Sequence, residues 1–330
     1  MKTYLFNIIR NLRLGLVLAV AFTICLITPT TSAASEIKFL SKKINIHGIQ
    51  RHYDIYTPKG LGDNPSLVIV LHGGWITKDL EKVVSGKNPG PTMSKMTGRG
   101  WEKIANTHNA IVVYPAAVNS RWNDGSDETK KITHNTDDVL FISKIIDTTK
   151  NDFQAHLSKV YVTGFSNGAK MSYRLACELG YKISAIAPVD AGMPKEQLKA
   201  CSPNSNKMPI LLMHGDTYPK SIQKMYNKRG IDPVQLWEDT VKFWLARNEC
   251  NGNSVSSSTL NKKFDGTSIV KKVFSDCFKG NVTVVRINGG GHAWPGGTQY
   301  LPKFLIGKRS KEINGANLIW NFFISASKKI

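Results

Sequence analysis

Acidic residues are scarce in this 330-residue chain. Asp and Glu number 24 against 44 Lys and Arg, which gives a net charge of +20. The basic residues are scattered as pairs such as Lys42-Lys43 and Lys271-Lys272, and no aromatic-interleaved stripe or nucleic-acid motif accompanies them. We therefore expect a solvated basic surface and no nucleic-acid partner. Weak attraction to anionic polymers or membrane surfaces is the alternative.

Apolar runs long enough to span a membrane are also lacking. The N-terminal run, residues 14–27, is shorter than the ~20 residues that a spanning helix needs. Basic residues precede it and small residues follow it at 28–34. This pattern predicts a secretory signal peptide over residues 1–34, cleaved near Ala33 or Ala34, rather than a membrane anchor. The mature protein is then secreted or periplasmic, and loss of three positive charges leaves it at +17.

Cysteine is rare, and one of the five cysteines lies in the predicted signal peptide. The other four allow three pairings. We expect the pairing local in sequence, Cys177 with Cys201 and Cys250 with Cys277. Free buried thiols are the alternative, which fits an oxidising compartment less well.

Apolar segments typical of buried strands alternate with helical patterns along the rest of the chain. Residues 67–71, 110–114 and 159–163 are the clearest such strands. The alternation predicts an α/β protein with a mostly parallel central sheet and helices on both faces. The Ser/Asn-rich segment 251–259 is predicted to be a surface loop and is too short for a linker, so residues 35–330 are expected to form a single domain.

The main chemical signal is Gly164-Phe165-Ser166-Asn167-Gly168, between a predicted strand and a predicted helix. Glycines on both sides of a serine permit the tight, strained turn that raises its hydroxyl above the edge of a sheet. The start of the following helix favours a developing negative charge. We therefore expect Ser166 to be a nucleophile.

A serine hydroxyl needs a general base, and His292 is the best candidate among eight histidines. Glycines flank it in the segment 289–297, and it follows the last predicted strand of the chain. This order, with the histidine after the nucleophile and before the final helix, is typical of the α/β-hydrolase fold.

Backbone N–H groups are expected to stabilise an oxyanion near Ser166. We expect one donor from Asn167 and a second from Gly74 or Trp75, because His72-Gly73-Gly74-Trp75 ends an early buried strand. His72 itself is expected to be structural.

The acid that orients His292 has two candidates. Asp216 follows the predicted strand 209–213, and Asp190 follows the preceding strand. Position alone favours Asp216 and leaves Asp190 as the alternative.

At these residues the sequence resembles the secreted polyhydroxybutyrate depolymerase and feruloyl esterase group of α/β-hydrolases. The matching motifs are Leu71-His72-Gly73-Gly74, the run from Thr163 to Met171, and the block from Gly289 to Gly297. The resemblance implies an ester hydrolase without metal or organic cofactor, and it also implies the two disulfides expected above. It places Trp122 and Trp294 where they would present an aromatic surface to substrate, with core packing as the alternative.

The chain departs from this group after the candidate strand 209–213. The group usually has His-Gly-Thr-x-Asp, whose aspartate is the triad acid, whereas this chain has His214-Gly215-Asp216-Thr217-Tyr218. Tyr218 stands where that aspartate would align. A shortened loop would bring Asp216 into the place of the acid; otherwise activity would be reduced, because a triad works as a unit.

The sequence therefore favours an exported serine carboxylic ester hydrolase. Its expected substrates are hydroxyalkanoate, feruloyl or acetyl esters, including polymeric ones, cleaved through an acyl-serine. A catalytically weakened polymer- or surface-binding protein on the same fold is the main alternative, because of the altered acid loop and the high basic charge. A serine peptidase is a third.

Overall fold

The computed structural model describes residues 38–74, 89–156, 158–201, 206–278 and 280–327, and the predicted signal peptide lies outside them. The strands are β1 Leu40–Ile46, β2 Ile49–Tyr56, β3 Ser66–Leu71, β4 Ala110–Pro115, β5 Val160–Phe165, β6 Ala185–Val189, β7 Ile210–Gly215, β8 Val255–Leu260, β9 Ser268–Phe274 and β10 Val282–Asn288. The helices are α3 Pro89–Met96, α4 Gly100–His108, α5 Asp127–Ile132, α6 Asp138–Phe153, α7 Asn167–Glu178, α8 Lys195–Ala200, α9 Lys220–Asn227, α10 Pro233–Arg247, α11 Lys303–Ile306 and α12 Gly315–Ser327.

Ten strands form one mixed sheet in the order β1-β2-β4-β3-β5-β6-β7-β10-β9-β8. The six central strands, from β4 through β10, pair in parallel, and antiparallel strands close both edges. A mostly parallel sheet requires crossover helices, which cover both of its faces. The predicted α/β class is confirmed.

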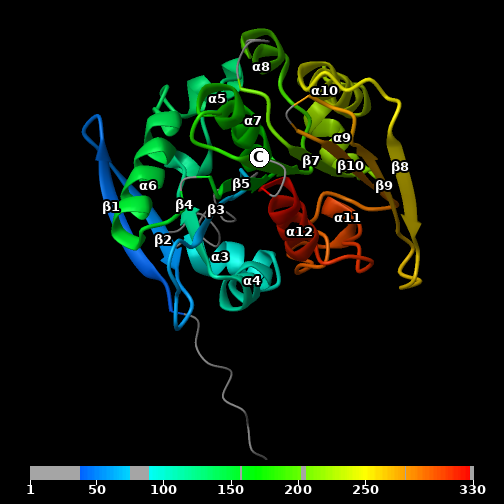
Figure 1. The fold of residues 1–330 in the computed structure, drawn as a ribbon. Helices are drawn as coiled ribbons and strands as arrows, with labels where there is room; N and C mark the ends of the chain where they lie inside the picture. Colours follow the sequence, from blue (N-terminus) through cyan, green and yellow to red (C-terminus); the bar gives the residue numbers. More distant parts are fainter. Residues whose placement is uncertain (1–37, 75–88, 157, 202–205, 279, 328–330) are drawn as a thin grey trace, which may run out of the picture. The chain divides into compact units, whose positions relative to one another are not determined.

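Helices lie on both faces of the sheet (Figure 1). The side chains of the central strands alternate between these two faces. On β5, Val160 and Val162 belong to the core beneath α6, α7 and α10, which contains Phe141. Tyr161 points the other way and stacks on Phe323 of α12, with ring centroids 4.6 Å apart. Helices α3 and α4 lie on the same side as α12. The carboxyl ends of the parallel strands are therefore held between two packed layers.

The two expected disulfides are present, Cys177–Cys201 and Cys250–Cys277. The first joins the end of α7 to the end of α8, and the second joins the end of α10 to the turn after β9. Disulfides of this kind are typical of chains that fold in an oxidising compartment.

One prediction about an element was wrong. Residues 255–259 of the expected surface loop belong to strand β8, which pairs antiparallel with β9 at the edge of the sheet. Five of its six residues are exposed, so the segment lacks the apolar pattern that would have revealed a strand. In the part of the chain that the structure describes, no helix has both the length and the apolarity required to cross a membrane.

Candidate active site

Ser166 lies at the sharp turn between β5 and α7. Its backbone has φ 55° and ψ −115°, an unfavourable conformation for a residue with a side chain. The flanking glycines are needed because the chain is crowded here. A Cβ on Gly164 would lie 2.3 Å from the carbonyl oxygen of Gly168, and one on Gly168 would lie 2.5 Å from the carbonyl oxygens of Leu71 and His72. The elbow that the motif predicts is therefore formed.

Strand register brings the other polar groups to Ser166. Phe165 pairs with Val189 across β5 and β6, and Val189 pairs with Met213 across β6 and β7. The residues that follow these partners are Ser166, Asp190 and His214. All three therefore stand in a row at the carboxyl edge of the sheet, where α/β proteins place their ligand sites.

His292 is brought over this row by its glycine-rich loop. Its Nε2 lies 3.0 Å from Oγ of Ser166. The loop packs tightly, since a Cβ on Gly291 would lie 2.3 Å from the Cα of Gly307. The main-chain N–H of His292 donates to Ile306, and Tyr300 donates its hydroxyl to the carbonyl of His292 at 3.0 Å. The imidazole is thus fixed by backbone contacts on both sides.

Asp190 stands behind His292. Its Oδ2 lies 3.0 Å from Nδ1 of His292, and its carboxylate is 4% exposed. Burial opposes the charge on Asp190, but His292 and His214 outweigh this effect and lower the pKa of the carboxyl to about 2. The residue is therefore ionised at neutral pH and stabilises a protonated imidazole.

Asp216, the preferred candidate for the acid, is not at His292. Its carboxylate instead pairs with Arg286 at 3.1 Å and accepts the main-chain N–H of Gly289 at 2.8 Å. The expectation that it occupies the acid's place is wrong because Asp216 lies two residues beyond the row formed by Ser166, Asp190 and His214. The alternative candidate, Asp190, occupies that place.

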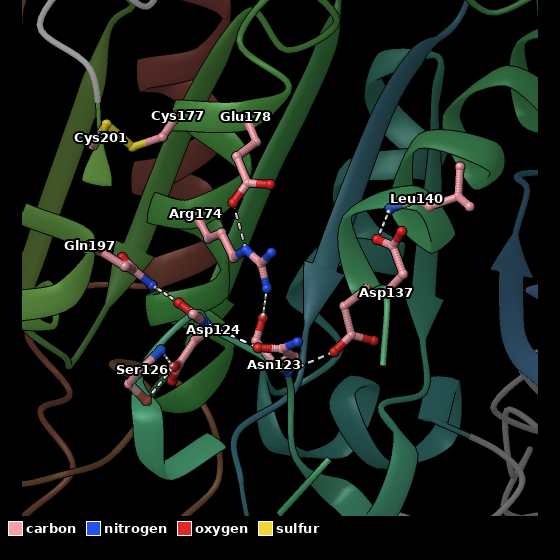
Figure 2. Close-up of polar contacts among 12 residues, drawn as sticks. Asn123, Asp124, Ser126, Asp137, Leu140, Arg174, Cys177, Glu178, Gln197 and Cys201 are labelled. Atoms are coloured by element: carbon pink, nitrogen blue, oxygen red, sulfur yellow. Dashed lines mark hydrogen bonds and ion pairs between the residues drawn. A yellow bond between two sulfur atoms is a disulfide. The ribbon is translucent and has the colours of Figure 1, made fainter. Parts of the chain in front are cut away.

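Asn167 begins α7 directly after Ser166, and its side chain is held by the segment that follows β4. Its Oδ1 accepts the main-chain N–H of Trp122 at 2.7 Å, and its Nδ2 donates to Asp124 at 2.8 Å. Figure 2 shows how this segment is fixed, with Arg174 donating to the carbonyl of Asn123 at 2.7 Å. Asp124 also accepts from Ser126 at 2.6 Å. The first turn of α7 is thereby fixed in position.

Of the other predicted oxyanion donors, Gly74 lines the same pocket as Ser166, and Trp75 lies outside the described residues. His72, which directly follows β3, has a hydrogen-bond partner at each ring nitrogen. Nδ1 donates to the carbonyl of Gly73 at 2.8 Å, and Nε2 accepts from the N–H of Ala117 at 3.0 Å. These backbone contacts indicate a structural role.

The expectation that Trp122 and Trp294 present an aromatic surface is wrong. Both side chains are 0% exposed. Trp122 packs on His72 and donates its indole N–H to the carbonyl of that residue at 2.8 Å. Trp294 packs edge-on against Trp101. Both tryptophans are therefore packed in the interior, which is the alternative that the sequence left open, and neither can touch a substrate.

The pocket above Ser166 is lined by both apolar and charged side chains. Phe165, Ile222, Tyr226 and Tyr300 are among the apolar and aromatic ones. Arg121, Asp124, Glu128, Lys170 and Arg229 are the charged ones beside them. Arg229 pairs with Glu128, and burial lowers the pKa of Arg121. Such a lining suits a ligand that has both apolar and polar parts.

A larger cavity, of about 1550 Å³, lies at the opposite edge of the sheet. Its lining includes Pro209 and Asn281, which directly precede β7 and β10. The described lining contains no histidine, so no imidazole there activates a hydroxyl. The smaller pocket at Ser166 is the candidate active site.

The chain was compared with known proteins. No protein-family model matches it. Feruloyl esterase D from Neurospora crassa is 25% identical over 171 residues, which are 52% of this chain and 54% of that protein. Poly(3-hydroxyalkanoate) depolymerase C from Paucimonas lemoignei is 30% identical over 140 residues, 42% of this chain and 30% of that protein. The chain thus spans about half the length of the first relative and less of the second.

Among solved structures, acetyl xylan esterase from Aspergillus awamori superposes with a TM-score of 0.53. It is 17% identical and covers 86% of this chain and 98% of its own. The chain has the α/β-hydrolase fold. The relatives also confirm the resemblance to the feruloyl esterase and polyhydroxybutyrate depolymerase group that the motifs predict.

Two polar residues near this site were missed in the sequence. His214 Nδ1 lies 3.3 Å from Oδ1 of Asp190, and its Nε2 is hydrogen-bonded to the hydroxyl of Tyr218. The signal that would have found His214 is its place at the end of a strand next to β6. Tyr218 carries no signal of this kind, because its position depends on the turn that leads into α9.

Proposed function

We propose that this protein is an exported serine carboxylic ester hydrolase with Ser166, His292 and Asp190 as its triad. The observation that supports the proposal most is the line of contacts from Oγ of Ser166 through the His292 imidazole to the carboxylate of Asp190, with each contact at 3.0 Å. This is the geometry by which a hydroxyl becomes a nucleophile at neutral pH.

The mechanism follows from these positions. As Oγ of Ser166 attacks the ester carbonyl, Nε2 of His292 takes its proton, and Asp190 stabilises the resulting imidazolium. The N–H groups of Asn167 and Gly74 bind the developing oxyanion. Collapse of the tetrahedral species expels the alcohol, which receives the proton from His292. Water, deprotonated by the same imidazole, then cleaves the acyl-serine and releases the acid.

Substrate classes are proposed from the relatives. They include a feruloyl esterase, an acetylxylan esterase and a poly(3-hydroxyalkanoate) depolymerase, so feruloyl, acetyl and hydroxyalkanoate esters are the proposed classes. A pocket lined by both aromatic and charged side chains suits such esters. The altered acid loop and the basic charge favoured the alternative of a weakened binding protein. The first of these two arguments is removed by the contact of Asp190 with His292.

Export through cleavage of residues 1–34 is part of the proposal, and the two disulfides support it. A secreted or periplasmic enzyme with a strongly basic surface would be attracted weakly to anionic polymers or membranes. Such attraction is ionic and weakens as salt is added.

The proposal is tested with the mature protein, a fluorophosphonate probe and p-nitrophenyl acetate. We expect the probe to label the protein and the ester to be hydrolysed, and we expect Ser166→Ala to abolish both. Ser275→Ala is the matched control, because Ser275 is an exposed serine at the end of β9. Folded protein that neither labels nor hydrolyses the ester would reject the function. Methyl ferulate, acetylated xylan and poly(3-hydroxybutyrate) then distinguish the substrate classes.

A further inference from the structure

The carboxylate of Asp190 has a second imidazole on the side away from the nucleophile. Oδ2 faces His292, whereas Oδ1 lies 3.3 Å from Nδ1 of His214 and accepts the main-chain N–H of Gly215 at 3.2 Å. The two oxygens of the carboxylate therefore have separate partners. Rotation of the carboxylate away from His292 would also break its contacts with β7.

His214 is itself held on two sides. Its ring stacks on Trp237 of α10 with centroids 4.5 Å apart and planes 22° apart. Its Nε2 is hydrogen-bonded to the hydroxyl of Tyr218. Only 6% of the surface of His214 is exposed, so water does not replace these partners.

The phenol of Tyr218 determines which nitrogen of His214 carries the proton. Burial and the charge of Asp190 raise the pKa of Tyr218, so its hydroxyl stays protonated and donates to Nε2. In the neutral ring the proton is then on Nδ1, which faces Asp190. Tyr226, a pocket residue, packs edge-on against Tyr218.

We propose that His214 and Tyr218 are positioning residues for the hydrolysis, which hold the carboxylate of Asp190 against His292. The inference rests on the proposed function, because it assigns a role within that triad. Neither side chain touches the nucleophile, and both act through Asp190. The contacts of His292 and His214 with Asp190 are close but imperfectly aligned, as Oδ2 of Asp190 and Nδ1 of His214 lack well-directed hydrogen bonds. Such contacts tighten when substrate binds.

The test measures kcat, KM and the rate of fluorophosphonate labelling in four variants of the mature protein. Tyr218→Phe removes only the hydroxyl, and we expect kcat and the labelling rate to fall about tenfold, with KM unchanged. His214→Leu removes the donor to Asp190 and should lower both rates further. His214→Asn keeps an N–H donor close to the position of Nδ1 and should restore part of the loss.

Tyr173→Phe is the matched control. Tyr173 is fully buried, and its hydroxyl donates to the carbonyl of Ala191 at 3.0 Å. This variant therefore also removes a buried hydrogen bond of a tyrosine hydroxyl, at the residue that follows Asp190. A loss in Tyr173→Phe equal to that in Tyr218→Phe would show general loosening and overturn the inference. Wild-type rates in Tyr218→Phe and His214→Leu would overturn it as well.

The same data separate this inference from the proposed function. If the wild-type protein is labelled at Ser166 and the His214 and Tyr218 variants are labelled at the same rate, the hydrolase function is supported and the positioning role is rejected. Wild-type protein that is never labelled rejects the hydrolase and the positioning role together. Labelling that falls in Tyr218→Phe and His214→Leu and partly returns in His214→Asn supports both.

Discussion

Two aspartates near the site differ in what surrounds their carboxylates. Asp190 is 4% exposed and lies between two imidazoles. Asp216 is 23% exposed at its side chain and is shared between Arg286, itself 61% exposed, and a main-chain N–H. A surface ion pair of the second kind contributes little to stability. The buried carboxylate of Asp190 can fix the tautomer and orientation of the His292 ring. Asp216 contacts only the start of the loop that carries His292.

We therefore expect different results from the two matched amide substitutions. Asp190→Asn should lower kcat by about 10⁴-fold, because an amide favours the wrong tautomer of the base. Asp216→Asn should change kcat by less than about threefold, in line with a surface substitution. Turnover of p-nitrophenyl acetate measures both, and a loss in Asp216→Asn as large as in Asp190→Asn would restore Asp216 as the acid.

The sequence indicated the proposed nucleophile and base more readily than the proposed acid. Ser166 and His292 lie in glycine-rich segments whose conformation is local, so a short motif suffices. The acid depends on which strand ends lie side by side, and this is a property of register between segments that are distant in sequence. Trp122 and Trp294 show the same limit, because an aromatic residue beside a motif packs inward or outward according to layers that the motif does not encode.

Elements around the elbow meet at backbone distances that leave no room for a side chain. Gly168 is the second residue of α7 and lies against the end of β3. A Cβ on this residue would lie 2.5 Å from two carbonyl oxygens there. These oxygens belong to Leu71 and His72, which directly precede Gly73 and Gly74. The packing of α7 on β3 therefore sets the distance between Ser166 and Gly74, the proposed second oxyanion donor.

Gly168→Ala tests this packing. The added methyl group meets backbone atoms, which cannot rotate away, so we expect destabilisation of about 1–3 kcal/mol. The melting temperature should fall by several degrees, and kcat should fall with it as β3 shifts from α7. Gly62→Ala is the control, because a Cβ there would lie 3.4 Å from the side chain of Asn109 in an exposed loop. An unchanged melting temperature and turnover in Gly168→Ala would show that the contact between Gly168 and the end of β3 leaves room for a methyl group.

Strands with continuous apolar sequence were predictable, and the edge strands were not. Residues 67–71 and 159–163 agree with β3 and β5 within a residue or two, because burial on both faces requires an uninterrupted apolar run. β8 is almost wholly exposed and shows only serine and threonine between its end residues. Its pairing with β9 comes from the edge that β9 offers, which no pattern within residues 255–260 records.

At the scale of the whole molecule, two buried ionisable groups at the ends of β3 and β6 are expected to lower the stability of the protein in acid. Burial lowers the pKa of His72 to about 4, and the two imidazoles, against the effect of burial, lower the pKa of Asp190 to about 2. In unfolded chains these groups titrate near ~6.5 and ~3.9. The unfolded state therefore binds protons first at both sites as the pH falls, and acid favours unfolding.

We expect the free energy of unfolding to be highest above pH ~6.5 and to fall in two windows. Protonation of His72 lowers the free energy of unfolding by about 3 kcal/mol as the pH falls from ~6.5 to about 4. Protonation of Asp190 lowers it by about 2.5 kcal/mol as the pH falls from ~3.9 to about 2. The sign is the same for both, because each folded-state pKa lies below its unfolded value. Guanidinium unfolding at a series of pH values, with the disulfides intact, measures how the free energy of unfolding changes with pH.

Replacement of His72 separates the first window from the general effect of positive charge. His72→Gln loses the ring that packs on Trp122 and should lower stability at every pH, yet it should flatten the slope between pH ~6.5 and 4 because no buried imidazole remains to protonate. His134→Gln, at an exposed position in the turn after α5, controls for the loss of an imidazole elsewhere. If the slope survives in His72→Gln, repulsion among the many surface lysines, rather than burial at the end of β3, drives acid unfolding.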